Sequence, residues 1–297
     1  MQGAIINSMS RSSRAALALL AALLLAACVV SPAAAVPRDP RLAGVESFAF
    51  GIGSGVIGPG YEARLAPYDL VVVDAQEASA GQVARLRARG ALVLGYLSIG
   101  TVEPGRPWTA AARPYRLDRY AEFGEDYADT SRAGFRALMA RRVAPALLRK
   151  RFDGLFLDNT DMIENHPRQA VGMRLLVGEL ARLVHGQGRL LFAQNGEDVI
   201  NPILRHLDGW NREDVTSTYD FDRRRYARVG AAAHRQAVAA LRRIGAAGKL
   251  VTATDYVRAG DVAGTAASIR AACAAGALPF VSDIALRRVA AAAPRCP

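Results

Sequence analysis

The chain has 297 residues, of which 51% are hydrophobic and 22% charged, and its formal net charge is +11. This composition is typical of a globular protein with a sizeable core, and it excludes an intrinsically disordered chain. The basic residues are scattered, and they are not accompanied by a nucleic-acid motif with interleaved aromatic residues. We therefore expect no nucleic-acid partner.

The N-terminus has the pattern of an export signal. Arg11 and Arg14 precede the apolar run 15–30, which is shorter than the roughly 20 residues that a membrane span requires. The alternative is a retained membrane anchor helix. We favour export, to the periplasm, the cell surface or the medium.

Two cleavage sites compete in this segment. LAAC (25–28) resembles a bacterial lipobox, in which Cys28 would become the lipidated N-terminus, and AAA (33–35) resembles an ordinary cleavage site. We favour the lipoprotein interpretation, with 1–27 as the signal, over cleavage after Ala35. Acyl chains would then hold the protein at a membrane surface.

Beyond the signal we predict a linker (28–44), one large globular domain (45–290) and a C-terminal tail (291–297). The domain alternates between apolar segments and segments with helical spacing. The predicted strands are 48–53, 68–75, 91–100, 152–161, 189–196, 207–214, 249–256 and 277–284, and the predicted helices are 81–90, 134–151, 168–185, 202–206, 231–247 and 262–275. Segment 101–130, rich in Pro, Gly and aromatic residues, is predicted to be irregular.

Eight strands, most of them followed by a helix, indicate an α/β fold with a parallel sheet buried on both faces. Their number and the length of the domain favour a (β/α)8 TIM barrel. The alternative is an open doubly wound sheet, which GIGSGVIG (51–58) would favour if it were a dinucleotide loop. Its spacing departs from that fingerprint, because Val56 stands where a glycine is needed.

Most predicted strands end in a carboxylate or an amide. In a TIM barrel the C-terminal strand ends surround one mouth, where active sites lie. Any single residue of this kind could instead cap the next helix, and we expect this most for Asp161, whereas Asp214 could be a surface residue. The polar strand-end residues are Asp74, Gln76, Tyr96, Ser98, Glu103, Asp158, Asn159, Asp161, Gln194, Asn195, Arg212, Glu213, Asp214, Asp255, Tyr256 and Asp283.

The residue types at the strand ends restrict the chemistry. The four histidines, at 166, 185, 206 and 234, fall in predicted loops or helices, which disfavours a His-bound metal or a Ser–His pair at the mouth. Calcium or magnesium bound by carboxylates stays open. Glycoside hydrolysis by two carboxylates fits the residues best, and it needs neither a cofactor nor a metal.

The sequence resembles glycoside hydrolase family 114, whose type activity is endo-α-1,4-polygalactosaminidase. The resemblance covers about residues 45–285 and rests on the order of five motifs. They are YDLVVVDA (68–75), GYLSIGTVEPGRPW (95–108), FDGLFLDNTD (152–161), FAQNG (192–196) and DGWNRED (208–214). The chain departs from the Gly-Glu-x-Glu pattern of many members, because it has Gly-Thr-Val-Glu at 100–103.

The resemblance implies a retaining pair, with Asp158 as nucleophile and Glu213 as acid/base. Asp214 competes with Glu213, and we expect only one of these neighbours to face the mouth, because adjacent strand residues point to opposite faces. The expected substrate is an extracellular polysaccharide, an α-1,4-linked polymer of galactosamine or N-acetylgalactosamine. The substrate-binding candidates are Asp74, Tyr96, Glu103, Arg106, Asn159, Asn195, Asp255 and Asp283.

Two further expectations concern assembly and activity. Cys273 and Cys296 are an even pair beyond Cys28, and in an oxidising compartment they suggest a disulfide that ties down the C-terminal tail. We expect a monomer. The alternative to an enzyme is a TIM barrel that binds a glycan or an envelope partner without cleaving it.

Overall fold

The computed structural model describes residues 39–297 except 54, 57, 59, 60 and 198. The predicted export signal, both cleavage sites and Cys28 lie outside the described residues. Within the described part of the chain, no helix is both long enough and apolar enough to cross a membrane.

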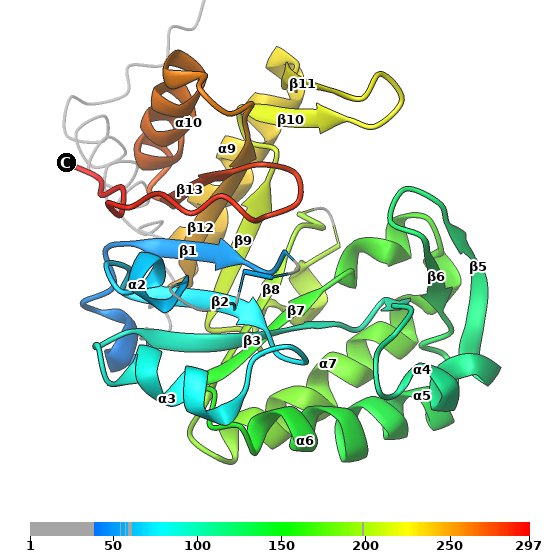
Figure 1. The fold of residues 1–297 in the computed structure, drawn as a ribbon. Helices are drawn as coiled ribbons and strands as arrows, with labels where there is room; N and C mark the ends of the chain where they lie inside the picture. Colours follow the sequence, from blue (N-terminus) through cyan, green and yellow to red (C-terminus); the bar gives the residue numbers. More distant parts are fainter. Residues whose placement is uncertain (1–38, 54, 57, 59–60, 198) are drawn as a thin grey trace, which may run out of the picture. The chain divides into compact units, whose positions relative to one another are not determined.

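Eight parallel strands form the central sheet, in the order β1-β2-β3-β7-β8-β9-β12-β13 (Figure 1). The first and last strands meet through their side chains, and the rings of Phe48 and Phe280 lie 6.0 Å apart. This nearly closed sheet with outer helices confirms the predicted (β/α)8 barrel. The strands are β1 (Phe48–Gly51), β2 (Leu70–Asp74), β3 (Leu92–Ser98), β7 (Gly154–Asp158), β8 (Leu190–Gln194), β9 (Gly209–Glu213), β12 (Leu250–Tyr256) and β13 (Leu278–Ser282).

The strands read as apolar runs because both of their faces are buried. Every residue of β1, β2, β8 and β12 is buried, as expected for a parallel sheet that encloses a packed interior. Aromatic rings fill part of this interior, where Phe50 packs against Phe156 with ring centroids 4.9 Å apart.

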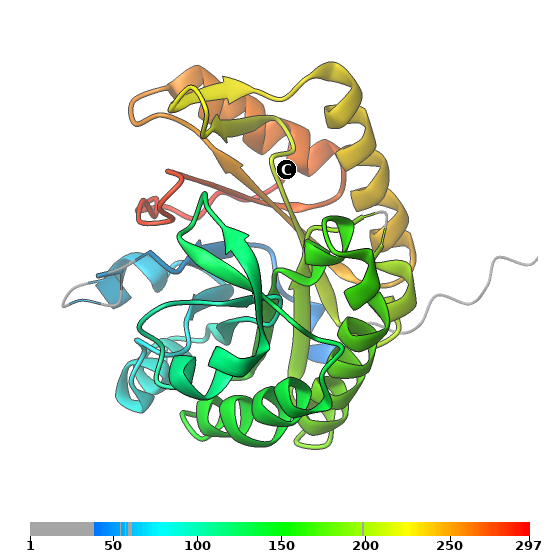
Figure 2. The same ribbon diagram turned by 90° about the vertical axis from the view of Figure 1, so that its right-hand side faces the viewer.

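Helices surround the sheet (Figure 2). A capping box formed by Ser79 and Gln82 starts α3, and a π-helical segment, η3, precedes Pro145, which cannot donate a backbone hydrogen bond. The predicted helices are confirmed as α3 (Ala80–Arg87), α5 (Ala133–Leu138) with η3 (Met139–Val143) and α6 (Ala144–Leu148), α7 (Ala170–His185), α8 (Asn201–Leu204), α9 (Ala231–Ala246) and α10 (Val262–Ala274). A short helix, α2 (Tyr61–Leu65), was not predicted.

Two antiparallel insertions stand on the face at which the strands end (Figure 2). The first follows β3 and contains β4 (Thr101–Val102), α4 (Thr109–Ala112), β5 (Arg116–Tyr120) and β6 (Glu125–Ala128). The second is the hairpin of β10 (Ser217–Asp220) and β11 (Arg225–Arg228). The expectation that 101–130 is irregular was therefore wrong. Strands β5 and β6 are short and partly exposed, so they lack the apolar runs of the barrel strands.

The segment that follows β13 packs against the segment between β1 and β2. The hydroxyl of Tyr61 donates to the Arg287 carbonyl oxygen at 3.3 Å, and that of Tyr68 donates to the Ala290 carbonyl oxygen at 3.2 Å. Cys273 of α10 and Cys296 of the tail form a disulfide, with their Cα atoms 5.4 Å apart. The segment after β13 is thus attached to the barrel by hydrogen bonds and by the disulfide.

The disulfide should contribute substantially to stability, because it closes a loop between residues 23 positions apart. A disulfide across a loop of this length restricts the conformations of the unfolded chain and stabilises the folded state by about 3 kcal/mol. We expect Cys273→Ser/Cys296→Ser to lower the free energy of unfolding by about this amount in chemical denaturation. Reductant should destabilise the native chain to a similar extent and leave the double variant unaffected. An unchanged unfolding free energy in the double variant would contradict this role.

Candidate active site

A cavity of about 480 Å³ opens at the C-terminal ends of the barrel strands. Residues on or directly after all eight barrel strands line it, from Phe50 on β1 to Ile284 beyond β13. Both insertions contribute as well, through Glu125 of β6 and Tyr219 of β10 among others. The polar strand ends therefore meet in one hollow, as the fold class requires.

Asp158, the last residue of β7, is held by three donors. The Tyr96 hydroxyl donates to its Oδ2 at 2.6 Å, while Gln194 Nε2 and the backbone N–H of Asn159 donate to its Oδ1 at 2.5 and 2.6 Å. Burial raises the pKa of Asp158, and these three hydrogen bonds oppose the increase because they favour the charged form.

The backbone at Asp158 is fixed by a close approach of the turn after β3. A Cβ atom on Gly100 would lie 1.9 Å from the Asn159 carbonyl oxygen, so a larger residue there would displace this segment. Asn159 itself has a φ of 57°, a left-handed conformation that Asn tolerates better than most residues. Its side chain donates to Ser98 Oγ at 3.0 Å. The carboxylate of Asp158 is thus held through its own side chain and through the backbone beside it.

Glu213, the last residue of β9, is held by two donors. Asn195 Nδ2 donates to its Oε2 at 2.7 Å, and the Tyr256 hydroxyl donates to its Oε1. Burial, followed by the nearby negative charge of Asp158, raises the pKa of Glu213 to about 8. These surroundings favour the protonated form of Glu213, whereas Asp158 has more donors that stabilise its charged form.

Two successive residues at the end of β8 connect these carboxyl groups. Gln194 contacts Asp158, and Asn195 contacts Glu213 through both its side-chain amide and its Oδ1, which accepts from the Glu213 backbone N–H at 3.0 Å. Trp210 Nε1 donates to the Asn195 carbonyl oxygen at 2.8 Å and fixes the backbone there. The β8 end thus sets the position of one carboxyl group relative to the other.

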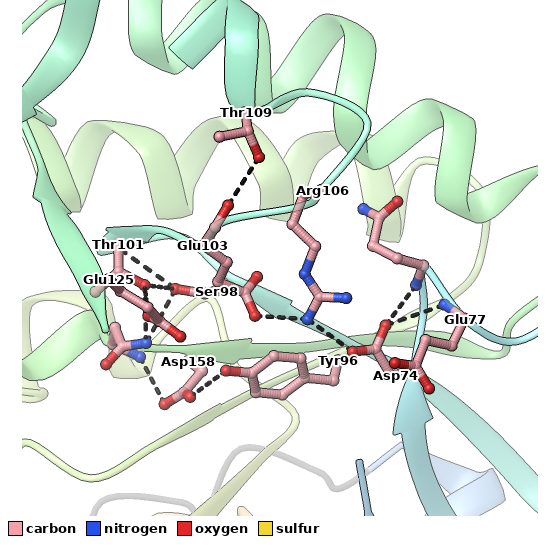
Figure 3. Close-up of polar contacts among 12 residues, drawn as sticks. Asp74, Glu77, Tyr96, Ser98, Thr101, Glu103, Arg106, Thr109, Glu125 and Asp158 are labelled. Atoms are coloured by element: carbon pink, nitrogen blue, oxygen red, sulfur yellow. Dashed lines mark hydrogen bonds and ion pairs between the residues drawn. The ribbon is translucent and has the colours of Figure 1, made fainter. Parts of the chain in front are cut away.

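Arg106 joins two further carboxylates on the wall formed after β2 and β3 (Figure 3). Its NH2 group lies 2.7 Å from Asp74 Oδ2 and 2.5 Å from Glu103 Oε1. Asp74 also accepts backbone hydrogen bonds from Gln76 and Glu77, which fix its orientation. This ion triad is only slightly exposed, and it sets two carboxyl groups against one guanidinium group.

Thr101, where the sequence departs from Gly-Glu-x-Glu, lies against a carboxylate from another strand. Its hydroxyl donates to Glu125 Oε2 at 2.6 Å (Figure 3). Burial raises the pKa of Glu125 to about 7. An acidic group thus stands next to position 101, supplied by β6 of the first insertion.

Asp161 and Asp214 also line the cavity. Asp161 lies in the first turn of η4 (Thr160–Glu164), but Asn159 is the N-cap, so the prediction of a pure cap was wrong. Burial raises the pKa of Asp161 to about 7 and that of Asp214 to about 6. Asp214 faces the cavity together with Glu213, contrary to expectation. It lies beyond the strand with a φ of 55°, where the alternation of faces no longer applies.

The structure brings most of the predicted site residues together and places two elsewhere. Asp255 accepts backbone hydrogen bonds from Thr216 and Ser217 at 2.9 and 3.2 Å, and so anchors the base of the β10–β11 hairpin. Asp283 accepts from the Arg287 backbone N–H at 3.0 Å. The predicted residues that line the cavity are Asp74, Tyr96, Glu103, Arg106, Asp158, Asn159, Asn195 and Glu213.

Sequence reasoning missed the residues that the insertions contribute. They belong to short polar strands and turns, and the signal for them was the local density of aromatic and acidic residues, as in YAEFGEDY (120–127). Among the described residues, no group of three or more His, Cys, Asp or Glu side chains is arranged to hold a metal ion. The missed lining residues are Tyr120, Glu122, Phe123, Glu125, Thr218, Tyr219 and Phe221.

Solved structures of glycosidases share this fold. The glycoside hydrolase domain of PelA from Pseudomonas aeruginosa aligns with a TM-score of 0.72 and 24% identity, over 83% of this chain and 98% of that one. Ega3 from Aspergillus fumigatus, solved in complex with galactosamine, aligns with a TM-score of 0.63 and 18% identity, over 89% and 100%. The α-galactosidase TtGalA from Thermus thermophilus gives a TM-score of 0.55 and 14% identity, over 82% and 59%.

No curated protein matches the chain in sequence. The family model of glycoside hydrolase family GH114, in contrast, matches residues 32–295, which is most of the chain and contains every residue of the cavity. The buried carboxyl pair at the mouth of a TIM barrel agrees with that match. The chain belongs to glycoside hydrolase family GH114.

Proposed function

We propose that the protein is an exported retaining glycosidase that cleaves an α-1,4-linked polymer of galactosamine or N-acetylgalactosamine outside the cell. One observation carries the proposal: Asp158 and Glu213 are buried in the same cavity, where three donors stabilise the charge of Asp158 and two donors hold Glu213. Two carboxyl groups of this kind are what double displacement at a sugar requires.

The hydrogen bonds support a role for each residue. Three donors favour the charged form of Asp158, so it acts as the nucleophile. Glu213 has two donors and a pKa raised to about 8, so it begins the reaction as the proton donor. The assignment from hydrogen bonding agrees with the one implied by the family resemblance.

The reaction then proceeds in two displacements. The Asp158 carboxylate attacks the anomeric carbon while Glu213 transfers its proton to the leaving glycosidic oxygen, giving a glycosyl ester and a released chain end. Glu213, now a carboxylate, takes a proton from water, and the water oxygen attacks the anomeric carbon. Asp158 leaves as a carboxylate, and both groups return to their starting states.

The substrate proposal rests on the cavity wall and on a structural neighbour. Ega3 was solved with galactosamine bound, and the acidic wall around Asp74 and Glu103 would attract a free sugar ammonium group. Hydroxyl groups of the sugar would be bound by the polar side chains that surround the carboxyl pair. The proposed binding residues are Asp74, Tyr96, Glu103, Arg106, Asn159 and Asn195.

The N-terminal sequence supports export and anchoring. The basic start and short apolar run of residues 1–27 support removal of a signal, and the lipobox-like residues 25–28 support acylation of Cys28. A protein held at the membrane surface would meet its polysaccharide outside the cytoplasm.

Substitution of either carboxyl group tests the proposed reaction. We expect Asp158→Asn and Glu213→Gln each to reduce product release from galactosaminan by about 10³-fold or more, because each removes a reacting group. Chromatography of the released oligosaccharides measures the effect on acetylated and deacetylated polymer. Asp118→Asn, on the outer strand β5, is the matched control and should keep the native rate. Substantial release by Asp158→Asn would show that another carboxylate is the nucleophile.

The pH dependence follows from the raised pKa of Glu213. The first displacement needs this residue protonated, so kcat/KM should decrease as the pH rises through about 8. On the acidic side, activity should fall as Asp158 becomes protonated. Burial raises the pKa of Asp158, so this fall should occur at a higher pH than for an ordinary aspartate. Tyr256→Phe removes a hydrogen bond that lowers the pKa of Glu213, so the alkaline limb should shift upward. A profile that is flat from pH 6 to pH 10 would contradict these assignments.

A further inference from the structure

Two aromatic side chains meet across the mouth of the cavity, one from each insertion. Phe123 lies in the turn between β5 and β6, and Phe221 lies in the turn between β10 and β11. Their ring centroids are 5.2 Å apart with planes inclined at 67°, an edge-to-face contact. Both residues line the cavity that contains Asp158 and Glu213. We call this pair the aromatic bridge.

Tyrosines of the two insertions pack against the aromatic bridge. Tyr120 packs against Phe123 with centroids 5.2 Å apart and stacks on Tyr127 at 4.9 Å. Tyr219 packs against Phe221 at 5.2 Å and against Tyr226 at 5.1 Å. The two phenylalanine rings are thus held in place before any ligand arrives.

The fold gains little from the exposed part of this bridge. Phe123 is 49% exposed, and neither phenylalanine belongs to the hydrophobic core, whereas Tyr120 and Tyr219 pack against it. Ligand-binding surfaces typically combine solvent-exposed apolar side chains with the polar groups of a cavity. The bridge is continuous with the catalytic cavity, so its ligand belongs to the same substrate.

We infer that Phe123 and Phe221 form a sugar-binding subsite at the mouth, which holds a unit of the polysaccharide away from the bond that is cleaved. This inference rests on the proposed function. A pyranose has apolar C–H faces and polar edges. The bridge offers aromatic surface to such a face, and Glu122, which also lines the cavity, offers a carboxylate to its hydroxyl or ammonium groups. Long substrates therefore gain contacts that short ones cannot reach.

Binding to an inactive protein tests the subsite without cleavage. In an Asp158→Asn background, we expect Phe123→Ala and Phe221→Ala each to raise the Kd for galactosaminan about tenfold in calorimetric titration, because each removes one stacking surface. Phe123→Trp should retain binding. Leu175→Ala, a half-exposed position on α7 outside the cavity lining, is the control and should bind like its parent.

Catalysis in the otherwise native protein provides a second readout. The same alanine substitutions should reduce kcat/KM about tenfold on the polymer, while hydrolysis of 4-nitrophenyl α-galactosaminide should change less than about twofold. Equal losses on both substrates would overturn the inference, because they would indicate damage to the catalytic centre. Tighter binding after removal of either ring would overturn it too, since the bridge would then be an obstruction.

The two proposals fail in different ways. If the Asp158→Asn protein binds polymer through the bridge but the native protein releases no product, the subsite stands and the glycosidase assignment fails. If the native protein cleaves polymer but the alanine variants bind it as well as their parent, only the subsite fails. An Asp158→Asn protein that binds neither acetylated nor deacetylated polymer contradicts the subsite.

Discussion

The burial of two carboxyl groups in one cavity is the interaction on which the site depends. Asp158 and Glu213 lie at the ends of β7 and β9, and β8 runs between these strands. Bringing both groups out of water would be costly if both were charged. The structure offsets part of this cost with donors from Tyr96, Gln194, Asn195 and Tyr256. The raised pKa of Glu213 lowers this cost further because it favours the uncharged form, and the proposed reaction uses the proton of that form.

The barrel explains why such a pair can be assembled. Apolar strands with both faces buried hold their final residues in fixed register, and the parallel ladder brings the ends of β7, β8 and β9 to one rim. Gln194 and Asn195 then contact one carboxyl group each. A substitution at either position would therefore disturb the position of one carboxyl group relative to the other.

Charge is distributed unevenly between the cavity and the whole chain. Among the described residues that line the cavity, eight have carboxyl groups, four of them with pKa values raised to between about 6 and about 8, and Arg106 is the one cation, although the complete chain has a net charge of +11. Charges separated by more than about 10 Å are largely screened at physiological salt. The local acids therefore dominate what a sugar unit meets at the mouth, and Glu125 and Glu122 extend this surface along the first insertion.

The sequence predicted the barrel well because its strands are long apolar runs and its helices have regular spacing. It also predicted the strand-end acids, since the fold determines where strands end. It failed at the insertions, where β5, β6, β10 and β11 are short and polar. Contacts such as that of Phe123 with Phe221 join segments distant in the chain, and no local pattern encodes them. Asp255 and Asp283 occupy strand ends too, and only the three-dimensional contacts show that they bind backbone instead.

The anomeric configuration of the first product tests whether Asp158 and Glu213 act by double displacement. Proton NMR during the first minutes of galactosaminan hydrolysis would record it before mutarotation mixes the anomers. We expect the α-linked polymer to release the α-anomer first, because two displacements retain configuration. Initial release of the β-anomer would mean a single displacement by water and would contradict the role of Asp158 as nucleophile.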